Sequence, residues 1–151
     1  MGDGGKIRPY TQELGLLFRF LDVSLVFVAL WIASVLRGVS LHYEYMFAGV
    51  LGGLCFVIIG GSRGLYSTWR IGLLREELRQ IWMVWAWTCG ILVVVGFGIK
   101  TTEIFSRIAV LTWFLSVPMI LSFWRVLVRQ SLRRLRRSGR NTRRAVIGGA
   151  G

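Results

Sequence analysis

Four long apolar runs constrain the fold of this chain more than any other feature. They cover residues 16–36, 45–61, 81–99 and 104–127, and a helix of about 20 residues is enough to cross a bilayer. Hydrophobic residues make up 54% of the 151-residue chain. None of the runs alternates between polar and apolar residues, as a strand in a barrel wall would. We therefore expect an all-α membrane protein built as a four-transmembrane-helix bundle.

Basic residues are distributed unevenly between the segments that connect these runs. Of the nineteen Lys and Arg residues, all but Arg37, Lys100 and Arg107 fall on one side of the expected bundle. Cytoplasmic loops carry the excess of Lys and Arg. The charge distribution therefore predicts that both termini are cytoplasmic, as an even number of crossings requires.

The domain organisation follows from the last third of the chain. Residues 1–130 form the expected membrane module, and residues 131–144 form an Arg-rich juxtamembrane helix that runs along the membrane surface. The final segment, AVIGGAG at residues 145–151, is typical of the first strand and glycine turn of a Rossmann-like domain, here truncated before its helix. Gly149 and Gly151 are the candidate cofactor-binding residues of this incomplete nucleotide-type loop.

The net charge of +12 indicates anionic lipid as a partner and not nucleic acid. A basic segment just outside a membrane helix attracts anionic headgroups, and each Lys or Arg contributes about 1 kcal/mol. Guanidinium forks could also capture a single lipid phosphate, but a topology signal with generic lipid contact is the favoured interpretation. The candidate headgroup residues are Arg133, Arg134, Arg136 and Arg137.

Glycines in the second run predict a close helix contact. Gly49 and Gly53 lie four residues apart, a spacing that lets two helix backbones approach closely. The contact could join two copies in a homodimer or lie within the bundle, and packing within the bundle is favoured.

Two charged residues fall inside the first run, and a further amphipathic segment precedes the third. Arg19 and Asp22 lie three residues apart and are expected to pair on one helix, as a structural pair or lipid contact in preference to a proton or substrate site. Within residues 62–80, Leu74, Leu78 and Ile81 share a face opposite polar side chains, which predicts an interfacial helix.

We find no catalytic constellation and no metal site in the sequence. Glu76 and Glu77 are adjacent on a helix, so their side chains point about 100° apart. Cys55 and Cys89 lie inside apolar runs without metal-ligand spacing, and His42 stands alone in a short loop. The chain itself is therefore expected to be inactive and to need no cofactor.

Three stretches together resemble a known family. They are GLYSTWR at residues 64–70, IFSR at residues 104–107 followed by Trp113, and LRRSGRNTRRAVIGGAG at residues 135–151. The chain resembles the N-terminal region of large bacterial polyprenyl-phosphate glycosylphosphotransferases, which transfer a hexose-1-phosphate from a UDP-sugar to undecaprenyl phosphate and so initiate exopolysaccharide or capsule synthesis.

The resemblance implies a location in the bacterial inner membrane and a role in anchoring and assembly. It also implies that Mg²⁺ and the UDP-sugar are bound by a separate catalytic domain that these residues do not contain, and that undecaprenyl phosphate is a candidate lipid partner. Two alternatives stay open: a free-standing four-helix membrane protein, such as a small transporter or an assembly subunit, and a lipid-binding regulatory anchor.

Overall fold

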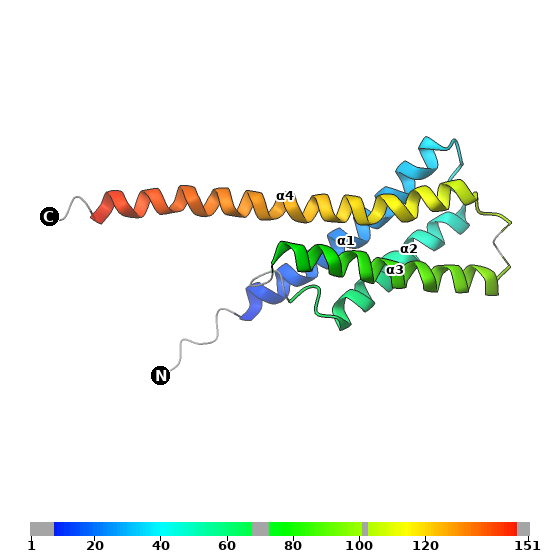
Figure 1. The fold of residues 1–151 in the computed structure, drawn as a ribbon, viewed down its shortest axis with the longest axis horizontal. Coiled ribbons are helices and arrows are strands. Elements are labelled where there is room, and N and C mark those ends of the chain that lie inside the picture. The colour runs from blue at the N-terminus through cyan, green and yellow to red at the C-terminus, as the bar shows by residue number, and fades with distance from the viewer. Residues whose placement is uncertain (1–7, 68–72, 101–102, 148–151) are drawn as a thin grey trace.

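The structure, a computed structural model, describes residues 8–67, 73–100 and 103–147. It consists of four helices: α1 (Arg8–Leu36), α2 (Tyr43–Ser62), α3 (Leu74–Gly98) and α4 (Arg107–Ile147). α1 and α3 each pack against both α2 and α4, which gives a four-helix bundle (Figure 1). α1 begins and α4 ends at the same end of this bundle (Figure 1), which we call the terminal end.

All four helices are long and apolar enough to cross a membrane. The apolar stretches are Gln12–Leu36, Tyr43–Ser62, Leu74–Gly98 and Arg107–Leu135. Large apolar side chains such as Phe20, Ile58 and Met119 lie exposed on the outside of the bundle. In water such a surface would be unfavourable, whereas in a bilayer it faces lipid. The chain is therefore a multi-pass membrane protein, as the apolar runs predict.

α1 and α2 end in the same way, because a glycine follows each helix in a left-handed conformation. Gly38 has φ of 63° and Gly64 has φ of 72°, values that glycine adopts without strain. The next residue then turns back, so that Val39 N donates to Ser34 O at 3.0 Å and Leu65 N donates to Gly60 O at 2.9 Å. These bonds satisfy carbonyls that the helix ends would leave without partners. The chain can thus reverse direction sharply after each crossing.

Aromatic side chains fill the centre of the bundle. The Trp85 ring lies 5.7 Å from that of Trp113 and 6.2 Å from that of Phe56, centroid to centroid. The Trp113 indole Nε1 donates to Val26 O at 3.1 Å, so its polar atom has a partner although the ring is buried. Trp85 and Trp113 thus both belong to the core of the bundle.

The expected interfacial helix is not a separate element. Residues 74–80 form the first turns of α3, which continues without a break to Gly98, while residues 68–72 lie outside the described part of the chain. No Gly or Pro interrupts residues 73–81, so nothing ends the helix between its amphipathic start and its apolar span. The amphipathic segment of residues 74–80 therefore leads into the third apolar span as the start of one continuous helix.

The expected strand at the end of the chain is also absent from the described residues. Residues 145–147 are the last turn of α4, and residues 148–151, including Gly149 and Gly151, lie outside the described part. A single strand has no neighbour to pair with its backbone groups, whereas a helix satisfies them internally. α4 extends well past the other helices along its own axis (Figure 1).

Candidate functional site

Four charged side chains from three helices meet near the terminal end of the bundle. Arg125 of α4 places Nη2 2.7 Å from Asp22 Oδ2 of α1 and Nη1 3.1 Å from Glu77 Oε1 of α3. Arg129, one turn further along α4, places Nη2 2.9 Å from Glu77 Oε2. We call Asp22, Glu77, Arg125 and Arg129 the charged cluster. Its two carboxylates and two guanidinium groups balance in charge.

Burial makes the charged cluster a strong constraint on the fold. The side chains of Asp22, Glu77 and Arg125 are at most 3% exposed. Removing one member of a buried ion pair leaves an uncompensated charge, which typically costs about 3–5 kcal/mol. Because Arg125 bonds to both α1 and α3, it fixes the position of α4 against two neighbouring helices at once.

Aromatic rings enclose the central guanidinium. Arg125 Cζ lies 5.0 Å from the centroid of the Phe18 ring and 5.8 Å from that of the Tyr66 ring. Tyr66 comes from the turn after α2, so this contact connects the site to the end of α2 as well. A guanidinium close to aromatic rings is attracted to their π-electrons, and the rings shield the ion pairs from water and lipid.

The Tyr66 hydroxyl lies beside the Asp22 carboxylate. Burial, and after it the neighbouring Asp22 charge, raises the pKa of the Tyr66 phenol, so the hydroxyl keeps its proton. Three buried polar atoms around the Asp22 carboxylate have no hydrogen-bond partner among the described residues: Tyr66 Oη, Asp22 Oδ1 and Arg125 Nε. Tyr66 Oη and Arg125 Nε are donors and Asp22 Oδ1 is an acceptor, so a small shift of these side chains or one buried water would supply the missing hydrogen bonds.

Arg19 does not pair with Asp22, contrary to expectation. Its guanidinium lies over the Tyr66 ring, with Cζ 5.1 Å from the centroid, and Asp22 pairs with Arg125 instead. Spacing along one helix brings Arg19 and Asp22 to neighbouring positions, but Asp22 points into the bundle, where Arg125 meets it. The expected ion pair at Asp22 is present, but its partner is Arg125 and not Arg19.

Sequence reasoning missed the roles of Arg125 and Glu77. Arg125 lies near the end of the fourth apolar run and Glu77 lies beside Glu76, and neither was expected to meet Asp22. A signal was present in the sequence: Arg125 continues a row of residues spaced by four that is otherwise apolar and buried. The row consists of Trp113, Val117, Leu121 and Arg125.

The other predicted sites fall in separate places. Gly49 and Gly53 face α1: a Cβ at Gly49 would lie 2.8 Å from Leu30 Cδ2, and one at Gly53 would lie 2.9 Å from Val23 Cγ1. This face of α2 is therefore occupied within the bundle. Arg133, Arg134 and Arg137 are exposed on the free part of α4, and only the backbone of Arg136 is described.

The cluster is arranged as a structural clamp and not as a reactive site. Both of its carboxylates form ion pairs with guanidinium groups, which accounts for their charge. No group of three or more His, Cys, Asp or Glu side chains with metal-binding geometry occurs among the described residues. Cys55 and Cys89 are free thiols, and His42 Nδ1 lies 3.0 Å from Ser40 O in the loop before α2.

Comparison with known proteins supports the expected resemblance. The chain is 22% identical over 145 residues to the UDP-glucose:undecaprenyl-phosphate glucose-1-phosphate transferase of Escherichia coli (strain K12). The alignment covers 95% of this chain and 31% of the relative, so the chain spans about a third of that protein's length. No solved structure matches.

A family model gives the second result. It is described as a CoA-binding domain and matches residues 61–151, from the end of α2 through α3 and α4. Because this match covers more than half of the sequence, the chain belongs to the CoA-binding domain family defined by that model.

Proposed function

We propose that the chain is the membrane-anchoring and assembly module of an enzyme that transfers a hexose-1-phosphate from a UDP-sugar to undecaprenyl phosphate, and so initiates exopolysaccharide or capsule synthesis. The observation that carries this proposal is the alignment of nearly the whole chain with 31% of a glucose-1-phosphate transferase. We place the module in the bacterial inner membrane with both ends cytoplasmic.

The geometry of the bundle suits an anchor. Four apolar helices provide the membrane crossings, and the charged cluster ties α1, α3 and α4 together where α4 leaves the bundle. From Arg125 to Ile147, α4 continues for about 33 Å at 1.5 Å per residue. A helix held rigidly at its base and extended in this way can position a domain attached to it at a fixed distance from the membrane.

The chemistry belongs elsewhere in this proposal. UDP-sugar binding and Mg²⁺ are assigned to a separate catalytic domain, because the carboxylates of the charged cluster are already engaged in ion pairs. Gly149 and Gly151 lie outside the described residues, so the proposed function does not rest on binding of a nucleotide or of CoA.

The alternatives make different demands on the structure. A transporter needs polar or ionised groups along a path through the membrane centre, whereas the buried charges described here gather near one end and neutralise each other. A regulatory lipid anchor would use the basic part of α4 alone and would need neither the clamp nor a transferase domain.

The test uses the full-length product of the gene. Removing residues 1–135 should abolish stable assembly in the membrane but preserve UMP release from UDP-sugar and undecaprenyl phosphate in detergent, to within a few-fold per folded molecule. Loss of UMP release from a truncated protein that is still folded would show that the module takes part in the chemistry. Unchanged membrane assembly would show that it is not the anchor.

A further inference from the structure

Arg63 carries a charge that no acidic side chain among the described residues neutralises. It is the first residue after α2, its side chain is exposed, and its Cζ lies 5.7 Å above the centroid of the Trp87 ring on α3. The acidic groups that form ion pairs among the described residues do so with Arg79, Arg125 and Arg129. Trp87 lies within an apolar span and is 58% exposed, so Arg63 sits on the outer, lipid-facing side of the bundle.

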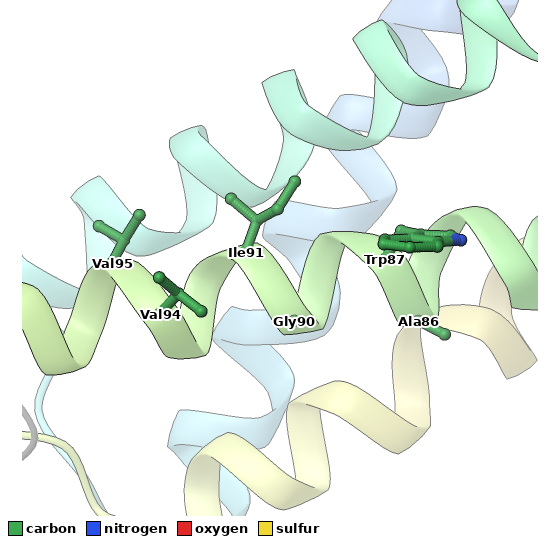
Figure 2. Close-up of a pocket in the computed structure, with 6 residues that line it drawn as sticks. All are labelled: Ala86, Trp87, Gly90, Ile91, Val94 and Val95. Atoms are coloured by element: carbon green, nitrogen blue, oxygen red, sulfur yellow. The ribbon is translucent and has the colours of Figure 1, made fainter.

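Trp87 is also one wall of an apolar groove on α3. Two adjacent rows of residues spaced by four form the groove, and Figure 2 shows that all of them come from this one helix. Gly90 forms its floor, and a Cβ there would meet no atom within 4 Å. The lining residues are Ala86, Trp87, Gly90, Ile91, Val94 and Val95.

The charge and the groove are complementary to different parts of one lipid. A guanidinium that stacks on an indole face keeps the N–H donors along its edges free, and these match two phosphate oxygens. An ionised side chain at the hydrocarbon boundary is costly unless a counter-charge or headgroup meets it. From Trp87 to Val95 the groove extends for about 12 Å along the helix, which suits part of an acyl chain.

We propose that Arg63 and the α3 groove form a binding site for an anionic phospholipid. The phosphate pairs with the free edge of the Arg63 guanidinium, and one acyl chain lies across Gly90 between the Trp87 and Val94 side chains. Net negative headgroups are preferred over zwitterionic ones because no carboxylate of the described chain offsets the Arg63 charge. The site is separate from the basic part of α4 and does not depend on the assignment to a transferase.

Quenching of Trp87 fluorescence by brominated lipids tests the site in the intact chain. The protein is reconstituted with acyl-brominated phosphatidylglycerol or with phosphatidylcholine carrying the same chains. The fluorescence of Trp87 is obtained by subtracting the emission of the Trp87→Phe variant from that of the wild type. One basic residue near a membrane surface contributes a binding free energy that corresponds to a preference of about fivefold for the anionic lipid. Equal quenching by the two lipids in the wild type would overturn the proposal.

Variants separate the two halves of the site. Arg63→Gln should abolish the preference and Arg63→Lys should keep part of it, whereas Arg79→Gln, which removes a charge already paired with Glu76 at 3.0 Å, should leave it unchanged. Gly90→Leu fills open space without a clash and should reduce quenching of Trp87 by both lipids. A preference that survives Arg63→Gln would rule out the headgroup contact, and undiminished quenching in Gly90→Leu would rule out the groove.

Discussion

The Trp85 indole donates a hydrogen bond from Nε1 to the backbone carbonyl of Phe114 at 2.8 Å. Phe114 lies four residues before Pro118 in α4, and proline has no N–H to bond the carbonyl at that distance. A side chain of α3 thus supplies the donor that the α4 backbone lacks. Inside a membrane, where water cannot take this role, the replacement bond is especially valuable.

The first prediction concerns this bond. Trp85→Phe should lower the free energy of unfolding by about 1–3 kcal/mol, because it leaves a buried carbonyl without a partner. In a Pro118→Ala background the backbone supplies its own donor, so the same substitution should cost less. A double-mutant cycle in detergent micelles measures the difference. Equal costs in the two backgrounds would show that ring packing, and not the hydrogen bond, accounts for the effect.

The second prediction concerns the charged cluster. Arg125→Met should destabilise the bundle by about 3–5 kcal/mol, because it leaves Asp22 buried without its partner. The matched control is Arg133→Met on the exposed part of α4, which should change stability by less than about 0.5 kcal/mol. Thermal unfolding in detergent compares the two. A similar, small effect of both substitutions would mean that the ion pairs of Arg125 do not hold the helices together.

The bundle was predictable from the sequence, and the partners inside it were not. Long apolar runs predict helices because a membrane leaves the backbone few other options. The identity of the Asp22 partner depends instead on how α1 and α4 are rotated against each other, and helix spacing alone says nothing about contacts across 103 residues. Helix spacing therefore predicts Arg19, three residues away, as the partner. Arg125 could have been suspected from its place in a buried apolar row.

The end of the chain shows a different limit of sequence reasoning. AVIGGAG has the composition of a strand and glycine turn, yet residues 145–147 continue α4. Strand propensity is weak when no second strand is available for pairing. The helix α4, in contrast, needs no partner for its backbone hydrogen bonds and continues through the Arg-rich segment to Ile147.

The third prediction is the orientation of the bundle. Alkaline phosphatase fused after Leu36 or Ile99 should be active. Both positions lie on the side of the bundle with few basic residues, which is the side expected to face the periplasm. Fusions after Gly61 or Gly151 should be inactive. Activity at Gly151 together with inactivity at Leu36 would reverse the proposed orientation.

The fourth prediction is a gradient of lipid contact along α4. Because α4 continues along its own axis (Figure 1), Arg137 lies about 6 Å further from the bundle than Arg133, a distance similar to the thickness of a headgroup layer, about 5–8 Å. Arg133→Gln with Arg134→Gln should therefore reduce retention of anionic lipid more than Arg136→Gln with Arg137→Gln. Mass spectrometry of the purified protein counts the retained lipids. Equal losses in the two double variants would indicate that α4 lies along the membrane surface after all.

UMP release most directly tests the claim that this chain anchors a transferase and performs no transfer itself. Purified residues 1–151 and the full-length product of the same gene are each incubated with UDP-sugars, undecaprenyl phosphate and Mg²⁺. We expect steady UMP release from the full-length protein and none above the blank from the module. Release from the module that survives repurification, or none from a folded full-length protein with any UDP-hexose, would contradict the account.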